Sequence, residues 1–127
     1  RIARVQQHHR RARLIADQMP EARLLIVGEG DLREGLEARR TELGLDEHVI
    51  FTGIRRDMPN LMAATDIVAF SSLYEGLPVT LLEAMAMERV LVSTAVGGVP
   101  DVVVDHENGL LVPVEDVKIV PVKRQMY

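Results

Sequence analysis

The sequence contains no cysteine and no tryptophan, and aromatic residues make up only 3% of its 127 residues. Without cysteine, the chain can form neither a disulfide nor a thiolate metal site, which fits a reducing compartment. The four histidines are scattered and show no spacing typical of metal ligands. No apolar run approaches the roughly 20 residues of a membrane-spanning helix, and no signal-peptide pattern is present. The formal net charge of −4 gives no general reason to expect a nucleic-acid partner.

With so few aromatic residues, the core must be built from Leu, Val, Ile, Ala and Met. The length suits one domain or part of one. The chain opens on Arg1 without an initiator Met, and we therefore expect it to be a fragment.

Apolar runs that suit strands alternate with segments that suit helices. We expect strands over 23–27, 48–52, 66–70, 90–93 and 110–112, and helices over 1–18, 31–43, 57–64, 79–87 and 101–104. Most of the strands are apolar at successive positions, as in sheets that are buried on both faces. The predicted fold class is therefore α/β, a Rossmann-like parallel sheet with helices on both faces.

Local signals set the expected ends of several helices. Asp31 is a plausible N-cap for the second helix, and Gly44 is its expected C-terminal stop. Pro78 suits the first position of the fourth helix, where its missing N–H would have had no partner. The first helix carries five arginines beside a thin apolar stripe, and this favours a solvated face over contact with a membrane or nucleic acid.

The stretch from Asp66 to Met87 organises the chain: D-I-V-A-F-S-S-L-Y-E-G-L-P-V-T-L-L-E-A-M-A-M. A short apolar strand leads through a Gly- and Pro-containing loop into an apolar helix, which is the usual phosphate-binding geometry of an open α/β sheet. Glu75 lies in the loop and Glu83 about one turn into the helix. Glu83 interrupts an apolar run, where Glu is rarely found unless it is paired or used.

The sequence does not match three common motifs of nucleotide-binding and catalytic sites. Gly28-x-Gly30 follows a strand, but the third glycine of a dinucleotide fingerprint would fall at Arg33, and no acidic residue closes the next strand. The phosphate-binding G-x-x-x-x-G-K-[ST] pattern is absent, and so is the G-x-S-x-G of serine hydrolases, which makes Ser71 and Ser72 poor nucleophile candidates.

The two carboxylates could be a glycosidase pair, which would have to face one another across a glycosidic bond. Their separation of eight positions cannot establish that, and the helix N-terminus favours an anion. The alternative is that each carboxylate accepts hydrogen bonds from sugar hydroxyls beside a diphosphate, since a vicinal diol can occupy both oxygens of one carboxylate. A purely structural Glu83, capped and paired, is the remaining option.

These residues resemble glycosyltransferase family 4, whose members are retaining GT-B enzymes. E-G-L-P-V-T-L-L-E, from Glu75 to Glu83, matches the family's E-x7-E signature. The likeness extends in order over residues 20–114, through L-L-I-V-G-E-G-D-L-R-E-G-L, V-I-F-T-G-I, D-I-V-A-F-S-S-L-Y-E-G-L-P, L-L-E-A-M-A, S-T-A-V-G-G-V-P-D-V-V and N-G-L-L-V-P. The matching part is the family's C-terminal, donor-binding domain, so we expect residues 1–116 to be part of that domain and 117–127 to be a divergent tail.

The resemblance implies the site and its substrate. Glu83 would hold the ribose hydroxyls of a UDP- or GDP-linked sugar, and Glu75 would hold the transferred hexose. Further donor contacts would come from Gly28, Gly30, Ile54, Gly76, Leu77, Pro78, Val79 and Thr80. The family implies a cytoplasmic enzyme that needs no metal and no cofactor and acts on a glycan, lipid or small-molecule acceptor. Peripheral association of the parent protein with the inner face of a membrane stays open.

The sequence also departs from the family. An Arg and a Lys that neutralise the donor diphosphate, the first strand and the N-terminal acceptor domain would all precede Arg1. Within the match, Glu88 stands where Gly is usual and Val90 where Pro is usual. In the strand order 3-2-1-4-5-6 the missing first strand is central, so its loss would leave two strand edges unpaired. Residues 117–122 could add as an edge strand.

We therefore expect the donor-binding part of a retaining glycosyltransferase that is inactive as an isolated fragment. A non-catalytic nucleotide-sugar-binding or interaction module is the alternative. A GT-B enzyme of other chemistry, such as a nucleotide-sugar epimerase, fits the run from Glu75 to Met85 less well.

Overall fold

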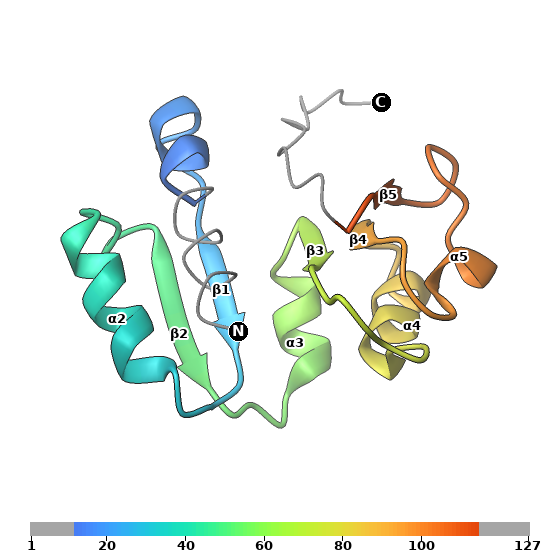
Figure 1. The fold of residues 1–127 in the computed structure, drawn as a ribbon, viewed down its shortest axis with the longest axis horizontal. Coiled ribbons are helices and arrows are strands. Elements are labelled where there is room, and N and C mark those ends of the chain that lie inside the picture. The colour runs from blue at the N-terminus through green and yellow to red at the C-terminus, as the bar shows by residue number, and fades with distance from the viewer. Residues whose placement is uncertain (1–11, 115–127) are drawn as a thin grey trace. The chain divides into compact units, whose positions relative to one another are not determined.

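The computed structural model describes residues 12–114, which form parts of two compact units. Unit 1 is described over residues 12–56 and unit 2 over residues 57–114. Figure 1 shows the course of the chain through both. The expected tail at 117–127 and the possible edge strand at 117–122 lie outside the described residues, as does the first part of the helix expected over 1–18.

Unit 1 is a pair of parallel strands with helical segments beside it. Residues 12–18 are helical, followed by β1 (Leu24–Val27), α2 (Arg33–Glu42) and β2 (Val49–Gly53). Strand β1 pairs with β2 in parallel, starting with Leu24 beside Val49, and α2 runs alongside the pair (Figure 1). Its core is small, consisting of Ala12, Ala16, Leu45 and Val49.

Unit 2 contains three parallel strands and three helices. The elements are α3 (Met58–Ala63), β3 (Ile67–Phe70), α4 (Val79–Ala86), β4 (Val90–Thr94), α5 (Val99–Val102) and β5 (Leu110–Val112). The strand order is β3-β4-β5. The helices bury their apolar side chains in one cluster with the central strand, made of Met62, Leu81, Ala84, Leu91, Val99 and Val103. The absence of Trp and the scarcity of Phe and Tyr make this an aliphatic core.

The α/β class and the parallel pairing are therefore confirmed. Among residues 12–114, β1 has a strand neighbour on one side only, and the same is true of β3. Burial along the strands is uneven, since Ile67 is 42% exposed and Val90 49% exposed. None of the helices in the described part is long and apolar enough to span a bilayer.

Three details of the helix ends differ from the sequence predictions. Leu32, not Asp31, is the N-cap of α2 and no side chain caps it, because a turn from Gly30 to Arg33 already satisfies the Arg33 N–H at 3.0 Å. Pro78 is the N-cap of α4 and not its first residue: it is extended, and its carbonyl accepts the first helical bond, from the Leu81 N–H. Helix α5 begins at Val99, two residues before the expected start.

Helices α2 and α4 each end in a turn of the same type, but the residue with left-handed backbone is different in the two turns. In α2 the Gly44 N–H donates to Thr41 and the Leu45 N–H to Arg40, with Gly44 at φ +63°. This is a Schellman motif, which calls for a residue in the left-handed region, as expected for the Gly44 stop. In α4 the equivalent bonds come from Glu88 and Arg89, and Glu88 takes φ +54°. The position where the sequence departs from the family's usual Gly is thus one that favours Gly.

Candidate functional site

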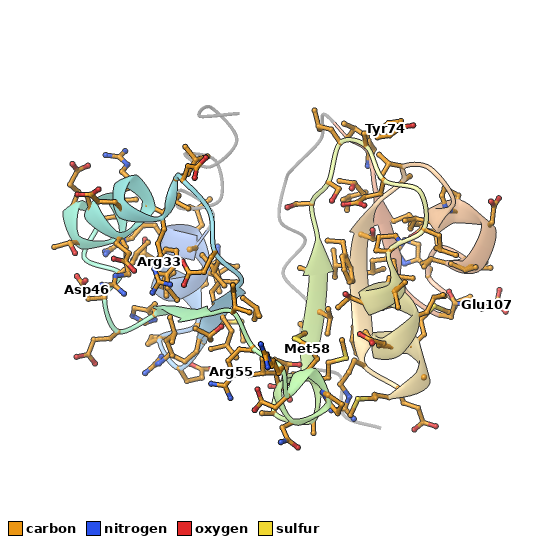
Figure 2. The ribbon with its side chains drawn as sticks, turned by 90° about the horizontal axis from the view of Figure 1, so that it is seen from below. Arg33, Asp46, Arg55, Met58, Tyr74 and Glu107 are labelled. Atoms are coloured by element: carbon orange, nitrogen blue, oxygen red, sulfur yellow. The ribbon has the colours of Figure 1, made fainter. Side chains whose placement is uncertain are left out.

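The loop between β3 and α4, residues 71–78, leaves the sheet beside the β4–α5 loop. Strand β3 pairs in parallel with β4, with Phe70 next to Ser93, so both chains leave their strands at the same edge. Carboxyl ends of parallel strands are where open α/β sheets bind ligands. Figure 2 shows Tyr74 at the tip of the β3–α4 loop, where its side chain is 91% exposed.

Glu75 is half-buried in this loop, and one of its oxygens is already engaged. The Ser72 hydroxyl donates to Glu75 Oε1 at 2.7 Å. The Ser72 carbonyl in turn accepts a hydrogen bond of 2.6 Å from the hydroxyl of Thr94, which is only 2% exposed at the end of β4. The carboxylate of Glu75 is therefore tied through Ser72 to the central strand, and its Oε2 makes no hydrogen bond with residues 12–114 that the structure shows.

The backbone of the loop is held against the β4–α5 loop. The Gly98 N–H donates to the Gly76 carbonyl at 2.7 Å. Gly97 has φ +53°, and a Cβ at this position would overlap the Glu75 carbonyl oxygen and lie 2.6 Å from that of Gly76. The two loops thus touch through backbone, and only glycine fits at the point of contact.

Glu83 lies about one turn into α4 and is exposed. Its sequence surroundings suggested a charge within an apolar environment, and this interpretation is wrong. Leu81 and Ala84 point into the core, whereas Leu82 and Glu83 lie on the outer side of the helix, with Leu82 40% exposed. No hydrogen bond or ion pair joins the Glu83 carboxylate to the described residues, so the capped and paired alternative is not what the structure shows either. Both Glu83 oxygens are open to a ligand.

The remaining predicted residues of unit 2 form the entry to α4. Leu77 is 39% exposed, Val79 is 69% exposed, and Thr80 is half-buried. Pro78 φ and ψ of −65° and 125° turn the chain from the loop into the helix. The structure thus brings Glu75, Gly76, Leu77, Pro78, Val79, Thr80 and Glu83 together within one loop and the first turns of one helix.

The other three predicted residues lie in unit 1, at the corresponding ends of β1 and β2. The Gly28 N–H donates to the Gly53 carbonyl at 2.9 Å, with φ of +121° at Gly28 and +71° at Gly53. This bond places Gly28 next to the residue before Ile54, which is 74% exposed. Gly30 has open space where a Cβ would be. All three are exposed residues at one edge of the strand pair.

Arg33 is a residue of this edge that the sequence reading did not single out. Its guanidinium contacts both Glu29 and Glu37, the latter at 2.8 Å, and lies 6.0 Å from the centre of the Phe51 ring. The hydrogen bond to Glu37, with the charges of Glu29 and Glu37, raises the pKa of Arg33 above its ordinary value. Figure 2 shows Arg33 on α2 of unit 1. The sequence signal was present as acidic residues four positions before and after Arg33.

Within residues 12–114 no group of three or more acidic or histidine side chains could hold a metal ion. Unit 2 offers carboxylate acceptors and unit 1 offers exposed glycines, each at the carboxyl ends of its own parallel strands. Ligands of open α/β sheets bind at such strand ends.

The family of the chain is established by comparison. Residues 3–120 match the family model described as glycosyl transferases group 1, and the chain belongs to this family. The lipopolysaccharide core biosynthesis glycosyltransferase LpsE of Rhizobium meliloti is 34% identical over 99 residues, covering 78% of this chain and 29% of LpsE.

Solved structures show the same relationship and assign the GT-B architecture. Anabaena Alr3699/HepE, crystallised in complex with UDP and glucose, is 34% identical with a TM-score of 0.74, covering 84% of this chain and 30% of HepE. The C-terminal domain of the group 1 glycosyl transferase LpcC from Francisella tularensis is 31% identical with a TM-score of 0.77, covering 87% of this chain and 60% of that domain. The chain thus spans less than a third of the length of LpsE and of HepE.

Proposed function

We propose that this chain is the donor-binding part of a retaining glycosyltransferase that takes a hexose from a UDP- or GDP-linked sugar. Family membership supports transferase chemistry, and the complex of HepE with UDP and glucose supports a nucleotide-sugar donor. The observation that carries the proposal is the pair of carboxylates along the β3–α4 loop and α4. One is fixed by Ser72 and the other is free to accept hydrogen bonds.

The two carboxylates have different roles in this proposal. Glu83 binds the ribose, whose two neighbouring hydroxyls can donate to both carboxylate oxygens. Glu75 receives the sugar. Its Oε1 already accepts a hydrogen bond from Ser72, and its Oε2 remains available to accept one from a sugar hydroxyl. The backbone at Gly76, Leu77, Pro78 and Val79, with Thr80, lines the sugar and the diphosphate at the N-terminus of α4, where the helix dipole favours an anion. Gly28, Gly30 and the Ile54 backbone contact the nucleotide.

Transfer itself requires more than these groups supply. In the described residues, neither the β3–α4 loop nor the first turn of α4 contains a Lys or an Arg. A leaving diphosphate is stabilised by cations placed where charge develops. We therefore propose that the chain binds the donor without transferring it and that transfer needs an acceptor domain with additional cations. That no metal takes part is a separate proposal, which rests on the resemblance to the family alone.

Calorimetric titration of the 127-residue chain with UDP and with UDP-glucose separates the two carboxylates. We expect Glu83→Gln to weaken both ligands, since both contain the ribose, by at least about tenfold, the usual effect of losing hydrogen bonds to a charged group. Glu75→Gln should weaken UDP-glucose and leave UDP unchanged. GDP and GDP-mannose tested in the same way decide the base.

Glu107→Gln is the matched control, since Glu107 lies on the segment between α5 and β5 (Figure 2) and should leave both affinities unchanged. Equal affinities for the unmodified chain and both site variants would refute the assignment of the two carboxylates. Donor binding without any transfer in a longer chain that includes an acceptor domain would point instead to a non-catalytic binding module.

A further inference from the structure

The contact between the β3–α4 and β4–α5 loops has a consequence for sugar binding. We infer that Ser72, Thr94 and Gly97 are positioning residues for the donor sugar, which hold the Glu75–Gly76 segment in place without touching the ligand themselves. The inference rests on the proposed function, because it assigns the sugar to Glu75.

The first step concerns the Glu75 side chain. A glutamate on an exposed loop has several rotamers of similar energy, and fixing one of them costs conformational entropy when a ligand binds. The Ser72 hydroxyl, 2.7 Å from Oε1, selects one orientation before the ligand arrives. It leaves Oε2 to accept from a sugar hydroxyl.

The second step concerns the position of Ser72. Its carbonyl accepts from the Thr94 hydroxyl at 2.6 Å, and Thr94, the last residue of β4, is 2% exposed. Thr94 pairs with Val112 of β5, so it is fixed by the sheet. The Thr94 hydroxyl thereby connects a rigid strand to the start of the loop, as a second shell of support does for binding groups in general.

The third step concerns the backbone of Glu75 and Gly76. The Gly98 N–H donates to Gly76 at 2.7 Å. This contact exists only because Gly97 lacks a Cβ, which would overlap the Glu75 carbonyl oxygen. A side chain at position 97 must push the segment away from the β4–α5 loop, and Glu75 with it. Glu83 lies on α4, beyond the displaced segment, and is not held by these contacts.

The inference therefore predicts a selective loss. The measured quantity is the sugar increment, defined as the ratio of the dissociation constants of UDP and UDP-glucose. Thr94→Val and Ser72→Ala should each reduce this ratio by about tenfold, the effect of one lost hydrogen bond to a charged or buried group. Most of the affinity for UDP should remain. A general loss of structure would instead weaken UDP and UDP-glucose alike.

Matched variants separate positioning from folding. Thr94→Ser retains the hydroxyl and should retain the increment, whereas Thr94→Val retains the shape and loses it. Gly97→Ala should abolish the increment. Gly35→Ala is its control, because Gly35 lies within α2 with nothing within 4 Å of the added Cβ. If Gly97→Ala does not fold, the comparison of Thr94→Val with Thr94→Ser still decides.

A readout that needs no ligand distinguishes this inference from the proposed function. Hydrogen exchange of the Gly98 amide should be slow in the unmodified chain and fast in Gly97→Ala, and Gly35→Ala should leave it slow. A chain that binds neither UDP nor UDP-glucose would refute the proposed function, and exchange at Gly98 would then decide whether the two loops hold one another. A full sugar increment in both Thr94→Val and Ser72→Ala, or unchanged protection of Gly98 in Gly97→Ala, would overturn the inference.

Discussion

Glu88 occupies the position after α4 where the backbone is left-handed, and replacing it should stabilise the protein. Its φ of +54° closes a Schellman motif, with Glu88 donating to Met85 and Arg89 to Ala84, both at 3.0 Å. For residues other than glycine this conformation costs about 1–2 kcal/mol. The side chain is exposed and carries a negative charge at the C-terminal end of a helix, which is unfavourable by a further 0.3–1 kcal/mol or so.

Glycine at this position removes both costs and introduces one of its own. The unfolded chain gains conformational freedom, which offsets about 0.4–1 kcal/mol. We therefore expect Glu88→Gly to raise the free energy of unfolding by about 1 kcal/mol, which corresponds to a rise in Tm of about 4 °C for a chain of this size. Urea and thermal denaturation of the 127-residue chain, followed by circular dichroism, measure both quantities.

Two companion variants test the reasoning. Glu88→Gln removes the charge and keeps the left-handed backbone strain, so it should recover only a few tenths of a kcal/mol. Gly44→Ala is the converse change in the equivalent turn of α2. A Cβ there would lie 3.7 Å from Arg13 Nη1, an ordinary contact, so only its φ of +63° opposes alanine. We expect it to destabilise by about 1 kcal/mol. If Glu88→Gly were no more stable than Glu88→Gln, the strain argument would be refuted.

Three further predictions concern packing, a loop and the edge of unit 1. Leu91→Ala should lower the free energy of unfolding by about 2–5 kcal/mol, because Leu91 is fully buried at the centre of the β3-β4-β5 sheet; an unchanged urea midpoint would contradict this. Asn108→Ala should cost about 1 kcal/mol by removing the bonds of its amide to the Val104 N–H and the Val102 carbonyl, measured in the same way against Glu107→Gln. Arg33→Met should accelerate hydrogen exchange of the Gly28 amide, since Arg33 holds Glu29 beside Gly53; exchange equal to that of the unmodified chain would show that the glycine contact needs no such support.

Much of the secondary structure could be predicted from the sequence, because runs of β-branched and aliphatic residues between Gly, Pro and Asn signals are local features. The strand at 66–70 and the turn at Asn108-Gly109 followed by β5 are confirmed. Helix starts were less well predicted. Asp31 seemed a suitable N-cap, but the Arg33 N–H that its side chain would accept from donates to the Gly30 carbonyl instead. This competition between two local hydrogen bonds is not visible in a residue pattern.

The candidate site was predicted only in part. The resemblance of the Glu75–Glu83 stretch to the E-x7-E signature indicated a glycosyltransferase, and membership of the glycosyl transferases group 1 family is confirmed. The retaining chemistry stays a prediction. The roles of the individual residues remain predictions. The environment inferred for Glu83 was wrong, because an apolar run in a helix says nothing about which of its residues face outward. Only packing places Leu81 and Ala84 inside and Glu83 outside.

The sequence by itself determined the order of strands and helices, the aliphatic core and the two carboxylates, since periodicity, composition and a short signature are properties of neighbouring residues. It also indicated that Glu88 stands where glycine is usual. Only the tertiary structure decided what holds the Glu75 loop. Ser72 lies more than twenty positions before Thr94 and Gly97 in the chain, and parallel pairing of β3 with β4 brings them to one edge of the sheet. The backbone contact between the β3–α4 and β4–α5 loops depends on a glycine, which has no side chain. The glycine is therefore the only sign of this contact in the sequence.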